Sequence, residues 1–170
     1  NTNTPSKASK EQLINQAIQF HLEGNIPEAS KCYQYCIKHG FNDHRVFSNY
    51  GIILQGLGKS QEAELSTRRA IELNPNFANS HSNLGYILRD LGQLQEADKS
   101  TRKAIELNPD LVDAHLNLGL ILRGLGQLQE AEKSYRKAIE LNPDFAEAHL
   151  NLGTIFRDLG QLQEADKSTR

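Results

Sequence analysis

LGYILRDLGQLQEADKSTRKAIELNPD, residues 84–110, is the stretch that decides the fold, because it recurs along the chain at a fixed interval. It matches LGLILRGLGQLQEAEKSYRKAIELNPD, residues 118–144, at 23 of 27 positions with an offset of 34 residues. A third copy starts at residue 152, and a more diverged copy covers residues 50–76. A fixed period of this length is typical of proteins built from stacked similar units rather than from one globule.

The 34-residue period divides the chain into five units and a tail. We expect the first, divergent unit at 10–43, and three further units at 44–77, 78–111 and 112–145. The fifth unit, 146–170, is truncated, with its second helix expected to begin near Leu162. Residues 1–9 are predicted to be a disordered N-terminal tail.

Each unit is predicted to contain two helices. Between residues 78 and 91, small and apolar residues recur every three or four positions, the spacing of one helix face. Gly92 follows as a helix-ending residue, and a second stripe runs from Leu94 to the stop at Asn108-Pro109. Gly85 on the first helix and Ala97 on the second leave room for close approach, so the pair is expected to form a tight antiparallel hairpin.

Seven positions of the unit carry a family resemblance: Leu84, Gly85, Leu88, Gly92, Ala97, Ala104 and Pro109. With the 34-residue period, they make the chain resemble the tetratricopeptide repeat family. The resemblance implies an all-α, right-handed superhelical solenoid of antiparallel helix pairs. The array is also similar to the asparagine-bearing superhelix that precedes the catalytic domain of protein O-linked N-acetylglucosamine transferases.

Composition and motifs narrow the range of functions. The net charge of −2 gives no electrostatic reason to expect nucleic acid, and no run of about 18 apolar residues predicts a membrane span. No phosphate loop, nucleophile elbow or zinc-ligand pair occurs, so we expect no catalytic residue, no metal and no cofactor. Cys32 and Cys36, one helical turn apart, are too distant for a disulfide, which favours a reduced, cytoplasmic protein.

The first helix of every unit carries an asparagine two residues before its glycine or, in the first unit, its alanine. The five are Asn15, Asn49, Asn83, Asn117 and Asn151. The family resemblance places this side of the helix on the inner, concave wall. Because a carboxamide can donate to and accept from a peptide bond, the row can hold an extended peptide without selecting its sequence. The alternative is structural: each asparagine bonds a neighbouring helix and recurs only through duplication.

Other residues accompany the asparagines on the expected concave wall. They are Tyr86 and Leu120, and the row Arg89, Arg123 and Arg157, which is either solvated or positioned to contact acidic side chains of a peptide. We therefore predict a non-catalytic module that binds an extended segment of a protein partner. Two alternatives remain open: the substrate-presenting part of a larger transferase, and self-assembly of copies end to end through the open C-terminal end.

Overall fold

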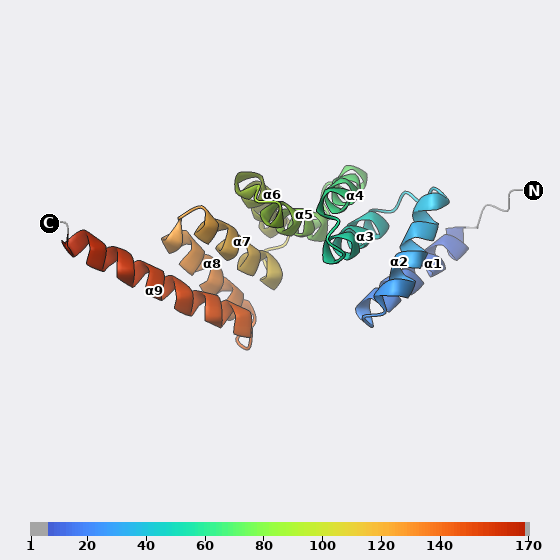
Figure 1. Cartoon of the computed structure of the whole chain (residues 1–170). Helices are drawn as coiled ribbons and strands as arrows, with labels where there is room; N and C mark the ends of the chain where they lie inside the picture. The colour runs from blue at the N-terminus through green and yellow to red at the C-terminus, as the bar shows by residue number, and fades with distance from the viewer. Residues whose placement is uncertain (1–6, 169–170) are drawn as a thin grey trace, which may run out of the picture. The chain divides into compact units, whose positions relative to one another are not determined.

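The computed structural model describes residues 7–168, and the side chains of residues 9–160. This part of the chain contains nine α-helices and no strand, which confirms the predicted all-α class of repeated helix pairs (Figure 1). The helices are α1 (Lys7–Leu22), α2 (Ile26–Lys38), α3 (His44–Gly56), α4 (Ser60–Leu73), α5 (Ala78–Asp90), α6 (Leu94–Leu107), α7 (Val112–Gly124), α8 (Leu128–Leu141) and α9 (Ala146–Ser168).

The chain forms two compact units, residues 1–83 and residues 84–170. The core of the first unit is Ile14, Ala17, Ala29, Tyr33, Cys36, Phe41, Val46 and Ile53. The core of the second unit is Leu116, Leu118, Leu122, Ala131, Tyr135, Ala138, Ala148 and Ile155. In both cores, the buried face of a first helix packs against small residues of a second helix. The recurrence of apolar residues every three or four positions predicts this packing.

A left-handed glycine ends the first helix of a repeat. Gly92 has φ 75° and Gly126 has φ 76°, a conformation that residues with a Cβ rarely adopt. Behind Gly92, the Gln93 amide donates to the Leu88 carbonyl oxygen at 2.9 Å, and the same bond follows Gly126. These bonds satisfy carbonyls at the helix end and turn the chain back along its own repeat.

The paired helices approach at the first-helix glycine. A Cβ on Gly85 would overlap Thr101 Oγ1, and a Cβ on Gly119 would overlap the ring of Tyr135. The side chains of Thr101 and Tyr135 are both fully buried. Glycine is therefore retained inside a helix, at a cost of about 1 kcal/mol relative to alanine, because the partner helix occupies the space of a side chain.

A histidine stabilises the loop between successive repeats. His115 Nε2 donates to the carbonyl oxygen of Pro109 at 2.7 Å, and His81 and His149 make the same bond to the proline six residues earlier. In the same loop, Asn108 Oδ1 accepts from the Asp110 amide at 3.1 Å, closing an Asx turn. Each of these histidines lies on a first helix and fixes the loop that precedes that helix.

Two boundaries differ from those expected. Helix α1 already begins at Lys7, so residues 7–9 belong to it and not to the tail, which agrees with the high helix propensity of lysine and alanine. Residues 1–6 lie outside the described part of the chain.

The fifth repeat does not turn at Gly160. Helix α9 continues from Ala146 to Ser168, and Gly160 lacks the positive φ of Gly92 and Gly126, so the separate helix expected from Leu162 is not formed. A left-handed turn at Gly160 would be stabilised by packing of the helix that follows it, and the side chains of residues 161–170 lie outside the described part of the chain. The predicted pairing of copies through this end depends on these same side chains and stays a prediction.

Candidate functional site

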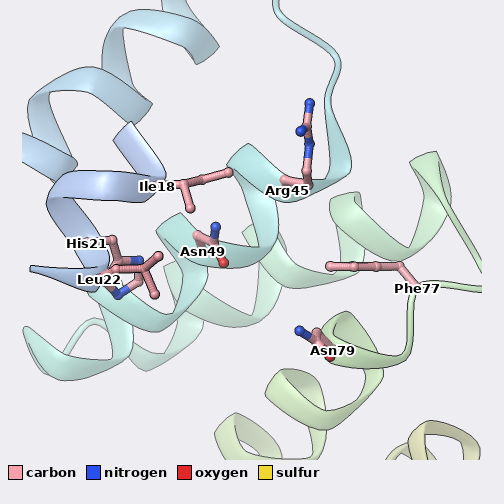
Figure 2. A pocket seen from close by; sticks show the side chains of 7 residues that line it. All are labelled: Ile18, His21, Leu22, Arg45, Asn49, Phe77 and Asn79. Atoms are coloured by element: carbon pink, nitrogen blue, oxygen red, sulfur yellow. The ribbon is translucent and has the colours of Figure 1, made fainter. Parts of the chain in front are cut away.

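A pocket in the first unit lies where three successive first helices meet (Figure 2). It has a volume of about 340 Å³. Its lining residues are Ile18, His21 and Leu22 of α1, Arg45 and Asn49 of α3, Phe77 of the loop before α5, and Asn79 of α5. This size is near the low end of about 300–1,000 Å³ for ligand sites, and it suits one or two side chains.

Arg45 is the charged group of the pocket, and its charge is neutralised by its neighbours. Its guanidinium bonds both oxygens of Glu11 at 2.9 Å, and Asp43 at 2.9 and 2.8 Å. Asp43 also caps α3 by accepting from the Arg45 amide at 2.9 Å. These bonds raise the pKa of Arg45 and link the first helices of two successive repeats.

The rest of the pocket wall is uncharged. Burial lowers the pKa of His21 below 6.5, so its ring is neutral at pH 7. Phe77 is half-buried and packs edge-to-face against His44, with ring centroids 4.6 Å apart. Leu22 keeps 79% of its surface exposed, which leaves an apolar side chain at the rim of the pocket.

The Asn49 carboxamide faces this pocket. It is half-buried and lies beside the Tyr33 hydroxyl, although no hydrogen bond of acceptable geometry reaches that hydroxyl within the described side chains. Burial raises the pKa of Tyr33 to about 12, and the neighbouring Asn49 lowers it to a smaller extent. Asn49 is therefore the asparagine of the row that lines this hollow of the surface.

The other asparagines of the row have different surroundings. Asn15 is exposed on α1, whereas Asn83 donates from Nδ2 to Ser48 Oγ at 3.0 Å. Asn151 donates to the Glu147 carbonyl oxygen of its own helix at 2.9 Å. The five asparagines share a register on the first helices, but they do not present equivalent carboxamides.

Asn117 is held by two neighbours. It is only 5% exposed, its Nδ2 donates to Thr101 Oγ1 at 3.3 Å, and its Oδ1 accepts from Arg89 Nη1 at 2.6 Å. Arg89 in turn bonds Asp90 and lies over the Tyr86 ring, 4.8 Å from its centroid. In this conformation Asn117 stabilises the packing of consecutive repeats, which is the structural role that the sequence left as the alternative.

The remaining predicted residues lie in the second unit. Arg123 Nε bonds Asp158 Oδ2 at 3.1 Å, and Leu120 lines a shallow hollow beside Arg123. Tyr86 is 38% exposed, and Arg157 is exposed on α9. The arginines therefore have different partners and do not form one uniform row.

Sequence reasoning missed most residues of the pocket. Ile18 and His21 occupy the same repeat positions as Tyr86 and Arg89, and Arg45 the same position as Asn79. The repeat register could have found them, but the first unit is so diverged that its side chains do not resemble those of the later units.

Repeated antiparallel helix pairs, with a hollow lined by their first helices, define the class of all-α repeat solenoids. One model described as TPR repeat matches residues 85–126 and 119–160, and two models described as tetratricopeptide repeat match residues 67–99 and 44–77. Together they extend from residue 44 to residue 160. The chain belongs to the tetratricopeptide repeat family.

Solved structures show the same fold. MamA from Desulfovibrio magneticus RS-1 superposes with a TM-score of 0.75 at 23% identity, over 93% of this chain and 89% of that one. Pseudomonas aeruginosa pilF superposes with a TM-score of 0.78 at 17% identity, over 93% of this chain and 72% of that one. The first TPR of Spaghetti (RPAP3), solved with the HSP90 peptide SRMEEVD, superposes with a TM-score of 0.68 at 24% sequence identity. The match covers 69% of this chain and 94% of that one. A comparison with curated protein sequences finds no match.

None of the described helices is both long and apolar enough to cross a bilayer.

Proposed function

We propose that this chain is a protein-interaction module that binds an extended peptide segment along its first helices, with the main contact in the pocket around Asn49. The observation that carries the proposal is that groove positions of three successive repeats meet in one hollow. A family member of similar fold has been solved with a bound peptide, which supports the same use of the surface here.

The pocket offers the two kinds of contact that an extended peptide needs. The carboxamides of Asn49 and Asn79 can bond peptide N–H and C=O groups, while Ile18 and Leu22 supply apolar surface. Asn117 is already bonded on both sides, so we place the peptide on the first unit rather than along the whole asparagine row.

Selection from a random peptide library on the intact chain tests this function. A selected peptide should broaden or shift the amide NMR signals of residues 18–22, 45–49 and 79. Its affinity should fall about tenfold in Asn49→Ala and stay unchanged in Asn25→Ala, an exposed asparagine whose side chain makes no capping bond. Failure to select any peptide, or equal binding by both variants, would contradict the proposal.

The transferase and self-assembly alternatives stay predictions. The first depends on the similarity of the array to the superhelix of the transferases, and the full reading frame would test it. The second depends on pairing between copies, which sedimentation of the chain over a range of concentrations would detect.

A further inference from the structure

The charge distribution of the pocket sets a condition on what it can bind. Arg45 is the only permanently charged side chain in the lining, and Glu11 and Asp43 together supply two carboxylates to its single guanidinium. Its Nε, Nη1 and Nη2 atoms all donate to these carboxylates. These bonds use four of the five guanidinium N–H groups, and with two carboxylates facing one cation the pocket has no net positive charge to attract an acidic ligand.

The titratable neighbours do not change this balance. Ile18, His21 and Leu22 enter from α1, and the His21 ring is neutral at pH 7 because burial disfavours its charged form. Phe77 enters from the loop before α5 and Asn79 enters from α5, and neither side chain carries a charge. The acidic side chains of Glu11 and Asp43, which lie next to Arg45, would repel a second carboxylate.

Apolar surface is available in the same hollow. Leu22 is 79% exposed at the rim, while Ile18 and Phe77 are half-buried beside it. Figure 2 shows the Leu22 and Ile18 side chains on α1 with Asn49 on the neighbouring helix. An apolar side chain placed here would remove Leu22 from water without burying an unpaired charge.

We propose that the pocket takes an uncharged apolar side chain, of leucine to phenylalanine size, from an extended peptide, and that it discriminates against an acidic residue at that position. The inference depends on the peptide-binding function proposed above and adds the chemistry of the ligand to it. The volume of about 340 Å³ accommodates such a side chain and the adjacent main chain.

The experiment uses a fluorescent peptide selected on the intact chain and a scan of its positions by fluorescence anisotropy. One apolar position should dominate, and its replacement by aspartate should weaken binding at least about tenfold. Leu22→Ser should weaken the unmodified peptide by about the same factor. Leu65→Ser should change it less than twofold, because Leu65 is 71% exposed on α4 and does not line the pocket.

The outcomes separate the two proposals. A peptide that requires Asn49 but is anchored by an acidic residue or a terminal carboxylate, with no effect of Leu22→Ser, would overturn the apolar-anchor inference and leave the peptide-binding function standing. A peptide whose binding ignores both Asn49→Ala and Leu22→Ser would overturn both.

Discussion

Asn117 of one repeat donates a hydrogen bond from Nδ2 to Thr101 Oγ1 of the repeat before it, across 3.3 Å and out of contact with solvent. In the preceding pair of repeats, Asn83 instead bonds Ser48, and Thr67 Oγ1 is buried without a hydrogen-bond partner in the described structure. The same residue types at the same repeat positions therefore make different contacts, and this difference can be measured.

Replacing these threonines by valine removes a hydroxyl with almost no change in shape. Thr101→Val should lower the free energy of unfolding by about 1–3 kcal/mol, because it leaves the buried Asn117 donor without its acceptor. Thr67→Val should leave the free energy of unfolding unchanged or raise it, because folding buries that hydroxyl away from water without giving it a hydrogen-bond partner. Urea denaturation of both variants provides the comparison, and equal losses would show that the Asn117 bond contributes nothing.

A methyl group added to the first-helix glycine reports whether a partner helix covers it. Gly119→Ala should destabilise by about 1–3 kcal/mol, because its Cβ would overlap the buried Tyr135 ring. Gly153→Ala should stabilise by about 0.5–1 kcal/mol, because among the described residues no atom other than the adjoining backbone of α9 lies within 4 Å of that Cβ, and alanine favours the helix. Thermal unfolding followed by circular dichroism measures both; a destabilised Gly153→Ala variant would mean that a second helix packs there.

The continuity of α9 gives a third test. Gly126→Ala forces a left-handed residue with a Cβ and should cost about 1–2 kcal/mol. Gly160→Ala should stabilise α9, because Gly160 lies inside the helix. The measurements are the midpoint of urea denaturation and the circular dichroism signal at 222 nm. A similar loss of stability in the two variants would indicate a turn at Gly160.

The Arg45 cluster predicts acid sensitivity. Burial opposes ionisation of Asp43, but hydrogen bonds from Arg45 more than compensate and lower its pKa. A carboxyl whose pKa is lower in the folded chain stabilises it fully above the unfolded pKa, and this stabilisation is lost as the pH falls through the folded value. Stability should therefore drop below about pH 4, and Asp43→Asn should flatten that part of the profile. An unchanged acid limb in urea titrations between pH 2 and pH 6 would contradict this assignment.

The 34-residue period, the helix pairs and their turns follow from the sequence because they depend on local residue types. Gly85 and Ala97 permit close packing, Gly92 ends a helix, and Asn108-Pro109 ends its partner. These requirements recur at every repeat, so one unit predicts the next.

The binding surface was less accessible to sequence reasoning, because it depends on which side chains meet across repeats. The sequence left the asparagine row open between peptide binding and a structural role, and in the structure Asn117 is held by Arg89 and Thr101 while Asn49 borders a pocket. Phe77 shares its repeat position with Leu111 and Phe145, whereas Leu22 belongs to no repeated pattern, and only the structure brings the two side chains to one pocket.

The stretch DLGQLQEADKSTR, at 90–102 and again at 158–170, separates what the sequence determined from what the tertiary structure decided. Its first copy turns at Gly92 and folds back as α6, whereas the second continues through Gly160 as part of α9 as far as Ser168. Helix propensity and glycine permit both conformations. The left-handed turn is stabilised where the following helix can bury a complete apolar face, because the free energy that selects it comes from packing between helices and not from the residues of the turn.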